Sequence, residues 1–140
     1  MSVIQPNELR VGNLLQRPEK VRSKLLDGDF IYFMVDAYMI RDCQHYKENW
    51  AFEGIPLTPE ILEKAGFRIL DDAGNWKSPE WNIWCSLETH FMIGELNGEY
   101  AYYFSAEDDF YSYYSPKIIY LHQLQNLYFA LTGQELTIKL

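Results

Sequence analysis

The longest amphipathic pattern in the chain lies near its C-terminus, in YLHQLQNLYFALTGQEL, residues 120–136. At about 100° per residue, six apolar side chains share one arc of a helix. These are Tyr120, Leu121, Leu124, Leu127, Tyr128 and Leu131. Gly133 follows at a position where a left-handed residue ends many helices. The pattern predicts a long helix over residues 120–132, with this arc in a core.

A second arc of the same helix carries a histidine, two amides and a phenylalanine: His122, Gln125, Asn126 and Phe129. Residues four apart on a helix are neighbours, so these side chains could form a recognition surface. Alternatively, loops pack over this arc and satisfy the amides by hydrogen bonds. No Lys, Arg, Asp or Glu occurs in residues 118–133. A solvated helix face normally carries charge, so the pattern favours a helix covered on more than one side.

A short helix is predicted in LTPEILEKAGF, residues 57–67. Thr58 is a good N-cap, because its hydroxyl can accept from an otherwise unpaired backbone N–H. Pro59 suits the first helical position, where its missing N–H costs nothing, and Gly66 suits the end of the helix. A helix of about two turns is too short to be stable alone, so its apolar side chains must dock on the rest of the fold.

A β-hairpin is predicted in FMIGELNGEYAYYF, residues 91–104. Asn97 and Gly98 are the residues that a two-residue type I′ turn requires, since both central positions need a positive φ. Leu96 then pairs with Glu99, and Gly94 lies opposite Ala101. This pair of small residues leaves a shallow spot where a helix could pack.

Other extended segments surround these elements. Residues 8–18 predict a first strand, and residues 21–42 predict two strands that flank a turn at Asp27 and Gly28. A strand-rich block covers residues 81–104. Residues 105–117 predict a loop that ends at Pro116 and that could contain a short extended piece. The whole predicts a single α+β domain over residues 1–140. One short and one long helix cover its twisted antiparallel sheet. An alternative form of this sheet is a small SH3-like barrel plus a hairpin.

Composition and charge narrow the classes of function. Hydrophobic residues make up 48% of the 140 residues, enough for a core, and the net charge of -8 opposes binding to a phosphate backbone. A nucleic-acid-associated role is therefore a disfavoured alternative. The two cysteines indicate no disulfide framework, and neither a signal peptide nor an apolar run of about 20 residues is present. We expect a cytoplasmic protein without a membrane segment.

No strong catalytic or metal-binding motif is found. Cys85 with His122, or Cys43 with His45, could pair a thiol with a base, so a small enzyme that uses Cys85 or His122 stays an alternative. Cysteine is more often buried and inert, however. Cys43 and His45 lack a second close pair of zinc ligands, and the acidic segments 27–29, 71–75 and 107–109 do not match a calcium-binding EF-hand. No cofactor, metal or catalytic residue is predicted.

A tyrosine-rich and acidic segment is the remaining candidate for binding. It follows the predicted hairpin and contains Tyr111, Tyr113 and Tyr114. Tyrosine suits binding surfaces because its ring is large, amphipathic and low in rotamer entropy. Alternatively, the rings belong to the wall of a sheet and only their hydroxyls are solvated.

Three segments of the chain resemble a family of small uncharacterised bacterial proteins: LRVGNLL, IPLTPEILEKAGF and YLHQLQNLYFALTGQEL. The family is common in Bacteroidetes genomes, often in phage-like or mobile-element regions. The resemblance covers about a third of the chain, and the aromatic insert between Trp76 and Tyr114 departs from it. The resemblance implies bacterial relatives and a phage-like or mobile-element setting. It implies no activity.

The leading hypothesis is a bacterial accessory protein, of phage or mobile-element origin, that is not an enzyme. It would act by binding a protein or a small ligand. The expected partner is another protein or a second copy of the chain, with nucleic acid disfavoured.

Overall fold

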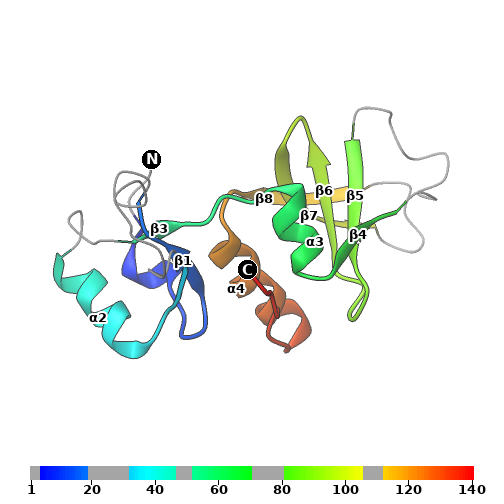
Figure 1. Cartoon of the computed structure of the whole chain (residues 1–140). Helices are drawn as coiled ribbons and strands as arrows, with labels where there is room; N and C mark the ends of the chain where they lie inside the picture. The colour runs from blue at the N-terminus through cyan, green and yellow to red at the C-terminus, as the bar shows by residue number, and fades with distance from the viewer. Residues whose placement is uncertain (1–3, 19–31, 47–51, 71–80, 106–111) are drawn as a thin grey trace. The chain divides into compact units, whose positions relative to one another are not determined.

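The computed structural model describes residues 4–18, 32–46, 52–70, 81–105 and 112–140 (Figure 1). The chain divides into two compact units. Unit 1 contains Met1–Pro56 and Tyr120–Leu127, and unit 2 contains Leu57–Ile119 and Tyr128–Leu140. The predicted α+β class is confirmed, with two antiparallel sheets of three and five strands. One domain over residues 1–140 stays a prediction.

Unit 1 is built on a three-stranded sheet in the order β2-β1-β3. Its elements are η1 (Pro6–Glu8), β1 (Leu14–Gln16), β2 (Tyr32–Met34), α2 (Ala37–Tyr46) and β3 (Glu53–Gly54). The central strand β1 confirms the strand predicted within residues 8–18. One core cluster of the unit consists of Ile4, Leu15 and Val35, against which Leu9, Met39, Ile40 and Phe52 pack.

The helix α2 corrects the prediction of strands over residues 21–42. β2 confirms a strand at Tyr32–Met34, and the predicted turn at Asp27 and Gly28 lies outside the described residues. The chain then turns helical because Asp36 acts as an N-cap, with its Oδ1 accepting from the Met39 N–H at 2.8 Å. Apolar side chains recur after this cap at helical spacing, and Cys43 is fully buried.

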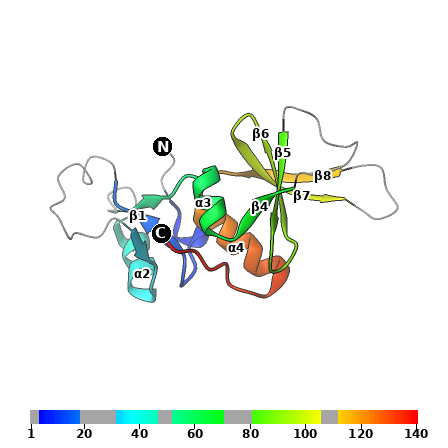
Figure 2. The ribbon, with the colours of Figure 1, turned by 45° about the vertical axis from the view of Figure 1, so that its right-hand side comes forward.

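Unit 2 contains a five-stranded antiparallel sheet in the order β4-β5-β6-β7-β8. Its elements are α3 (Pro59–Lys64), β4 (Phe67–Ile69), β5 (Trp81–Ser86), β6 (Met92–Leu96), β7 (Glu99–Ser105) and β8 (Ser112–Ile118). Figures 1 and 2 show that the sheet is strongly twisted, since β8 runs across the direction of β5 in both views. The strands that the structure describes close no barrel, so the SH3-like form of the prediction is not found.

Two predicted elements of unit 2 are confirmed in detail. In the hairpin, Leu96 pairs with Glu99 and Gly94 with Ala101. At the start of α3, the Thr58 hydroxyl oxygen accepts from the backbone N–H of Ile61 at 3.2 Å, and Pro59 takes the first position. These features depend on neighbouring residues, which is why the local sequence predicts them.

The strand β8 is a full strand of seven residues where the sequence predicts a loop with at most a short extended piece. Pro116 lies within this strand, which is tolerated because β8 is at the edge of the sheet and needs no N–H on its outer side. The pairing of β7 with β8 shifts register between Ala101 and Tyr103. The N–H of Tyr102, at the irregularity, donates to the Ser115 hydroxyl at 2.9 Å. A side chain thus replaces the missing ladder bond.

The helix α4 (Leu121–Thr132) confirms the long C-terminal helix, and Gly133 follows it with a φ of 72°. Its residues to Leu127 belong to unit 1, and those from Tyr128 belong to unit 2. Most of the predicted apolar arc is buried or half-buried, but Leu131 is 53% exposed. Among the described residues, none of the helices has the length and apolar character to cross a membrane.

Candidate functional site

The polar arc of α4 is covered in unit 1. His122 and Gln125 are 0% and 2% exposed, and Asn126 is half-buried. This burial confirms a helix that is covered on more than one side. Phe129 belongs to unit 2 and is 40% exposed, so the predicted set of four is not buried as one group.

The amide of Gln125 holds the backbone at the start of β1. Its Oε1 accepts from the Leu14 N–H at 2.8 Å, and its Nε2 donates to the Gly12 carbonyl at 3.3 Å. Both ends of the amide are therefore occupied by backbone, as expected for a buried polar side chain with a structural role.

The amide of Asn126 is occupied as well. Its Oδ1 accepts from Asn13 Nδ2 at 2.8 Å and from Arg10 Nε at 3.3 Å, while its Nδ2 donates to the Glu8 carbonyl at 2.7 Å. Asn13 also accepts from the Arg10 N–H through its Oδ1, and Gly12 supplies the positive φ of 96° in this turn. The two amides of α4 thus fix the turn before β1, and each of their polar atoms already has a protein partner.

His122 differs from these amides. Neither ring nitrogen has a hydrogen-bond partner among the described residues, and its Nε2 lies 3.9 Å from Glu8 Oε1. The ring stacks on Tyr120, with the ring centroids 5.7 Å apart. Burial lowers the pKa of His122, and the smaller opposite effect of Glu8 does not cancel it. The imidazole is therefore neutral at pH 7, and no thiol or hydroxyl of the described residues hydrogen-bonds to it.

The cysteines of the enzyme hypothesis are buried. Cys43 lies on the core side of α2, whereas His45 is exposed on the same helix, so this predicted pair does not form. Burial, and after it Glu8, raises the pKa of Cys43. In unit 2, burial raises the pKa of Cys85, whose thiol approaches the carbonyl of Ser86 at 3.5 Å. Both thiols stay protonated at neutral pH, which does not favour nucleophilic chemistry.

The tyrosine-rich segment is only partly described. Tyr111 lies outside the described residues. Tyr113 and Tyr114 lie on β8 and pair through their backbones with Phe104 and Tyr103 of β7. A binding surface formed by these tyrosines stays a prediction.

Metal-binding geometry is not found in the described part of the chain, where no group of three or more His, Cys, Asp or Glu side chains could hold an ion. The acidic segments 27–29, 71–75 and 107–109 lie outside that part.

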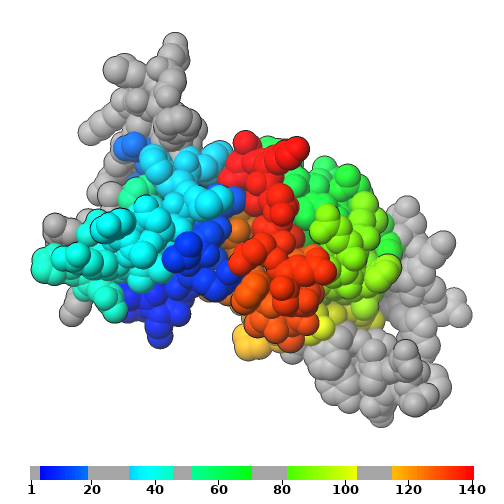
Figure 3. Space-filling view, turned by 90° about the horizontal axis from the view of Figure 1, so that it is seen from below, coloured from blue at the N-terminus to red at the C-terminus, as the bar shows by residue number. Residues whose placement is uncertain are grey.

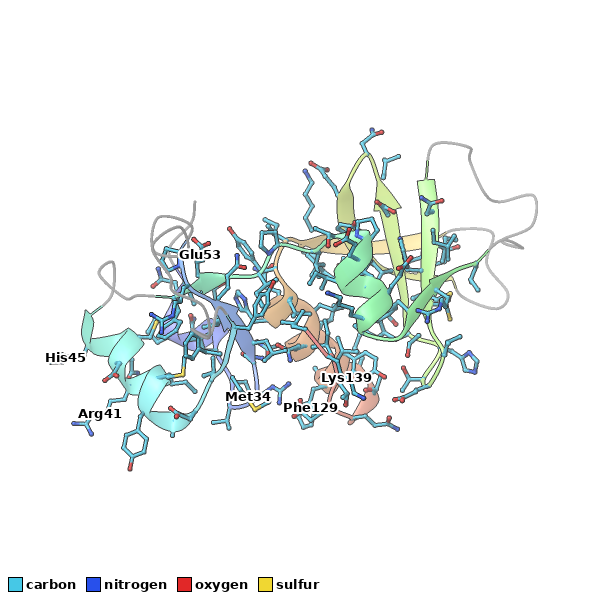
Figure 4. The ribbon with its side chains drawn as sticks, viewed as in Figure 1. Met34, Arg41, His45, Glu53, Phe129 and Lys139 are labelled. Carbon is cyan, nitrogen blue, oxygen red and sulfur yellow. The ribbon has the colours of Figure 1, made fainter. Side chains whose placement is uncertain are left out.

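A surface hollow of about 450 Å³ lies along the outer face of α2. It is lined by Tyr38, Arg41, Asp42, Gln44 and His45, and we call these residues the α2 face. Tyr38 is 75% exposed, and Arg41 and His45 point away from the helix (Figure 4). The prediction of strands over residues 21–42 does not show this helical face. The spacing of residues 38, 41, 42 and 45 along one helical side is the signal that could have revealed it.

Comparisons of the chain with protein-family models, with curated proteins and with solved structures give no match. The resemblance to the Bacteroidetes family therefore stays a prediction.

Proposed function

We propose that the protein acts by binding a partner protein through the α2 face. The observation that carries this proposal is the exposure of Tyr38, 75%, beside the hollow that Arg41 and His45 also line. Tyrosine and arginine are the residue types that, with tryptophan, contribute most to binding energy at protein interfaces.

The opposite side of α2 explains why the face is presented rigidly. Cys43 is fully buried, and its thiol approaches the Ile4 carbonyl at 3.6 Å. Met39 and Ile40 pack against the core of unit 1. A helix anchored in this way offers its outer side chains without a large loss of backbone entropy on binding, which favours affinity.

The chemistry of the face indicates the kind of partner. Tyr38 offers an apolar ring with a polar tip, and Arg41 and Asp42 offer one charge of each sign. The net charge of -8 disfavours an acidic partner. We therefore infer a neutral or basic protein that places an apolar side chain on the Tyr38 ring and pairs a carboxylate with Arg41.

Photo-crosslinking in the native host tests the proposal. A photoreactive amino acid replaces Gln44 in the α2 face, and a control replaces the exposed Glu63 on α3 of unit 2. We expect a crosslinked protein at position 44 that is absent at position 63. Tyr38→Ser and Arg41→Glu should each reduce the yield about tenfold or more, as the loss of an interface hot spot does.

Three results would overturn the assignment. The first is a partner whose yield is unchanged in Tyr38→Ser and Arg41→Glu. The second is loss of the partner when Tyr111, Tyr113 and Tyr114 are changed to Ala while the α2 variants keep it, which would move the surface to the tyrosine-rich segment. The third is a covalent dimer, which would replace the partner protein by a second copy of the chain.

A further inference from the structure

A second hollow, in unit 2, is lined by four separate segments of the chain and has a volume of about 270 Å³. We call it the tail pocket. Its lining comes from the end of α3, the turn between β5 and β6, α4 and the C-terminal tail. The lining residues are Lys64, Ala65, Gly66, Ser86, Leu87, Glu88, Tyr128, Leu136, Thr137 and Lys139. In Figure 3 the red C-terminal residues lie at the surface beside the green of α3, and Figure 4 labels Lys139 on the tail.

The turn that forms one wall of the tail pocket is held by several hydrogen bonds. The Ser86 N–H donates to the Phe91 carbonyl at 2.8 Å, and the His90 N–H donates to the Ser86 carbonyl at 3.1 Å. The Leu87 N–H donates to the Gly66 carbonyl at 3.3 Å, which ties the turn to the end of α3. The pocket wall is therefore preorganised for binding.

Ser86 has a hydrogen-bond donor left over. Its side-chain oxygen accepts from the backbone N–H groups of Glu88 and Thr89, at 3.3 Å and 3.4 Å. A hydroxyl has one proton to donate as well, and this proton has no acceptor in the described part of the chain. Because Ser86 is only 3% exposed, an unused donor there is costly unless a ligand accepts from it.

Tyr128 and Thr89 leave a second donor. Their hydroxyls share one hydrogen bond of 3.0 Å, and Thr89 also accepts from the Phe91 N–H. Two hydroxyls have two protons, and one shared bond uses one of them. With Thr89 donating, the proton of Tyr128 is left over, in a side chain that is 1% exposed and lines the tail pocket.

The charges at the tail pocket, like its unused hydroxyl donors, favour a negatively charged ligand. Lys64 and Lys139 contribute two positive charges and Glu88 one negative charge. Neither lysine forms an ion pair with a carboxylate among the described residues. The pocket thus has surplus donors and a local excess of positive charge in a chain whose net charge is -8.

We propose that the tail pocket binds a carboxylate carried on a small apolar body. The carboxylate accepts from the hydroxyls of Ser86 and Tyr128 and lies between the two lysines. The apolar body contacts Ala65 and Leu136, which are both 6% exposed. A volume of about 270 Å³ is at the lower end for ligand sites, so the body has only a few carbon atoms. This site is separate in its residues from the α2 face.

The full chain, labelled with ¹⁵N, provides the test. It is titrated at pH 7 and constant ionic strength with 3-methylbutanoate and with the neutral 3-methylbutanamide. We expect the backbone amide signals of Gly66, Leu87 and Glu88 to shift with the acid and saturate at a concentration on the order of 1 mM, as suits a ligand of seven heavy atoms. The amide should give no saturable shift.

A peptide arm identifies the source of the carboxylate. Acetyl-Ala-Leu with a free terminal carboxylate is compared with the same peptide as a terminal amide. Tighter binding of this peptide than of 3-methylbutanoate would assign the site to a chain terminus, and the reverse order would assign it to a free acid. Both orders support the proposal, since the carboxylate is the recognised group in each.

Variants locate the contacts. Lys64→Met and Lys139→Met should each weaken binding of the acid by roughly two- to fivefold, as exposed ion pairs do. Tyr128→Phe should weaken it about tenfold, because a hydrogen bond to a charged group is lost. Lys117→Met, which removes an exposed charge on β8, is the matched control and should change nothing.

The proposal fails if the acid and its amide shift the same signals equally, or if neither shifts them. It also fails if Lys64→Met, Lys139→Met and Tyr128→Phe all bind like the Lys117→Met control. A crosslinking result at the α2 face has no bearing on these outcomes.

Discussion

Replacement of Gln125 by methionine tests whether the amides of α4 are structural. Gln125→Met keeps an unbranched side chain of similar length and removes both polar groups. The Leu14 N–H and the Gly12 carbonyl then lose their partners. Two unsatisfied groups cost about 1–3 kcal/mol each, and burial of the apolar side chain returns roughly 1–2 kcal/mol. We expect a net loss of roughly 2–3 kcal/mol in the free energy of unfolding, a large part of the usual 5–15 kcal/mol.

Chemical unfolding in urea, followed by circular dichroism, measures this loss. Gln134→Met is the matched control, because Gln134 is exposed and its side chain makes no hydrogen bond among the described residues. The control should lie within about 0.5 kcal/mol of the original chain. Amide hydrogen exchange adds a local measurement: the Leu14 N–H should lose protection before that of Ile93 in the sheet of unit 2. Equal stability of the two variants would refute a structural role for Gln125.

Three further predictions concern unusual groups of the core. Burial lowers the pKa of His122. Below pH 6.5 the unfolded chain therefore binds a proton that the folded chain does not. Urea unfolding should show that the folding equilibrium constant falls by up to about tenfold for each pH unit by which the pH is lowered. A slope that persists in His122→Phe would contradict this cause. A Cβ at Gly54 would lie 2.6 Å from ring atoms of Tyr120, so Gly54→Ala should cost about 1–3 kcal/mol in thermal unfolding, and less once Tyr120→Ala has emptied the space. Burial, together with Glu95, raises the pKa of Tyr100 to about 12. Stability should therefore fall between pH 10 and pH 12, and absorbance at 295 nm should show a late titration that Tyr100→Phe removes.

Local signals account for the elements that could be predicted from the sequence. The start of α3 needs only Thr58 and Pro59, and the hairpin needs only Asn97 and Gly98 between alternating strands. Each signal acts within a few residues. For this reason the register of the hairpin, with Leu96 opposite Glu99, was predictable without any tertiary information.

The helix α2 was missed and the strand β8 was predicted only in part, and both depend on competing signals. Residues 37–46 contain apolar and aromatic side chains that also suit a strand, and the cap at Asp36 decides for a helix. In β8, Pro116 looks like a breaker, yet an edge strand tolerates it. Position in the sheet is a tertiary property, so the local sequence of residues 112–118 could not supply it.

The polar side chains of α4 were predicted as a candidate site, and the contacts of two of them are long-range. Gln125 meets Leu14, 111 positions away in the sequence, and Asn126 meets Asn13, 113 positions away. No spacing rule connects residues at such separation. The sequence therefore indicates that these amides need hydrogen-bond partners, but only the fold shows which residues the partners are.

Hydrogen-bond capacity that remains unused separates a buried polar group with a structural role from one at a site. Each polar atom of the Gln125 and Asn126 amides already has a protein partner, so a ligand would have to compete with partners that the fold supplies. His122 has unused capacity but lines neither of the two hollows described above, so its unpaired nitrogens are a cost to stability. Ser86 and Tyr128 both line the tail pocket, and the hydroxyl of each has a proton without an acceptor. Burial alone would have selected the α4 arc as the site. Unused donors that border a hollow select the tail pocket instead.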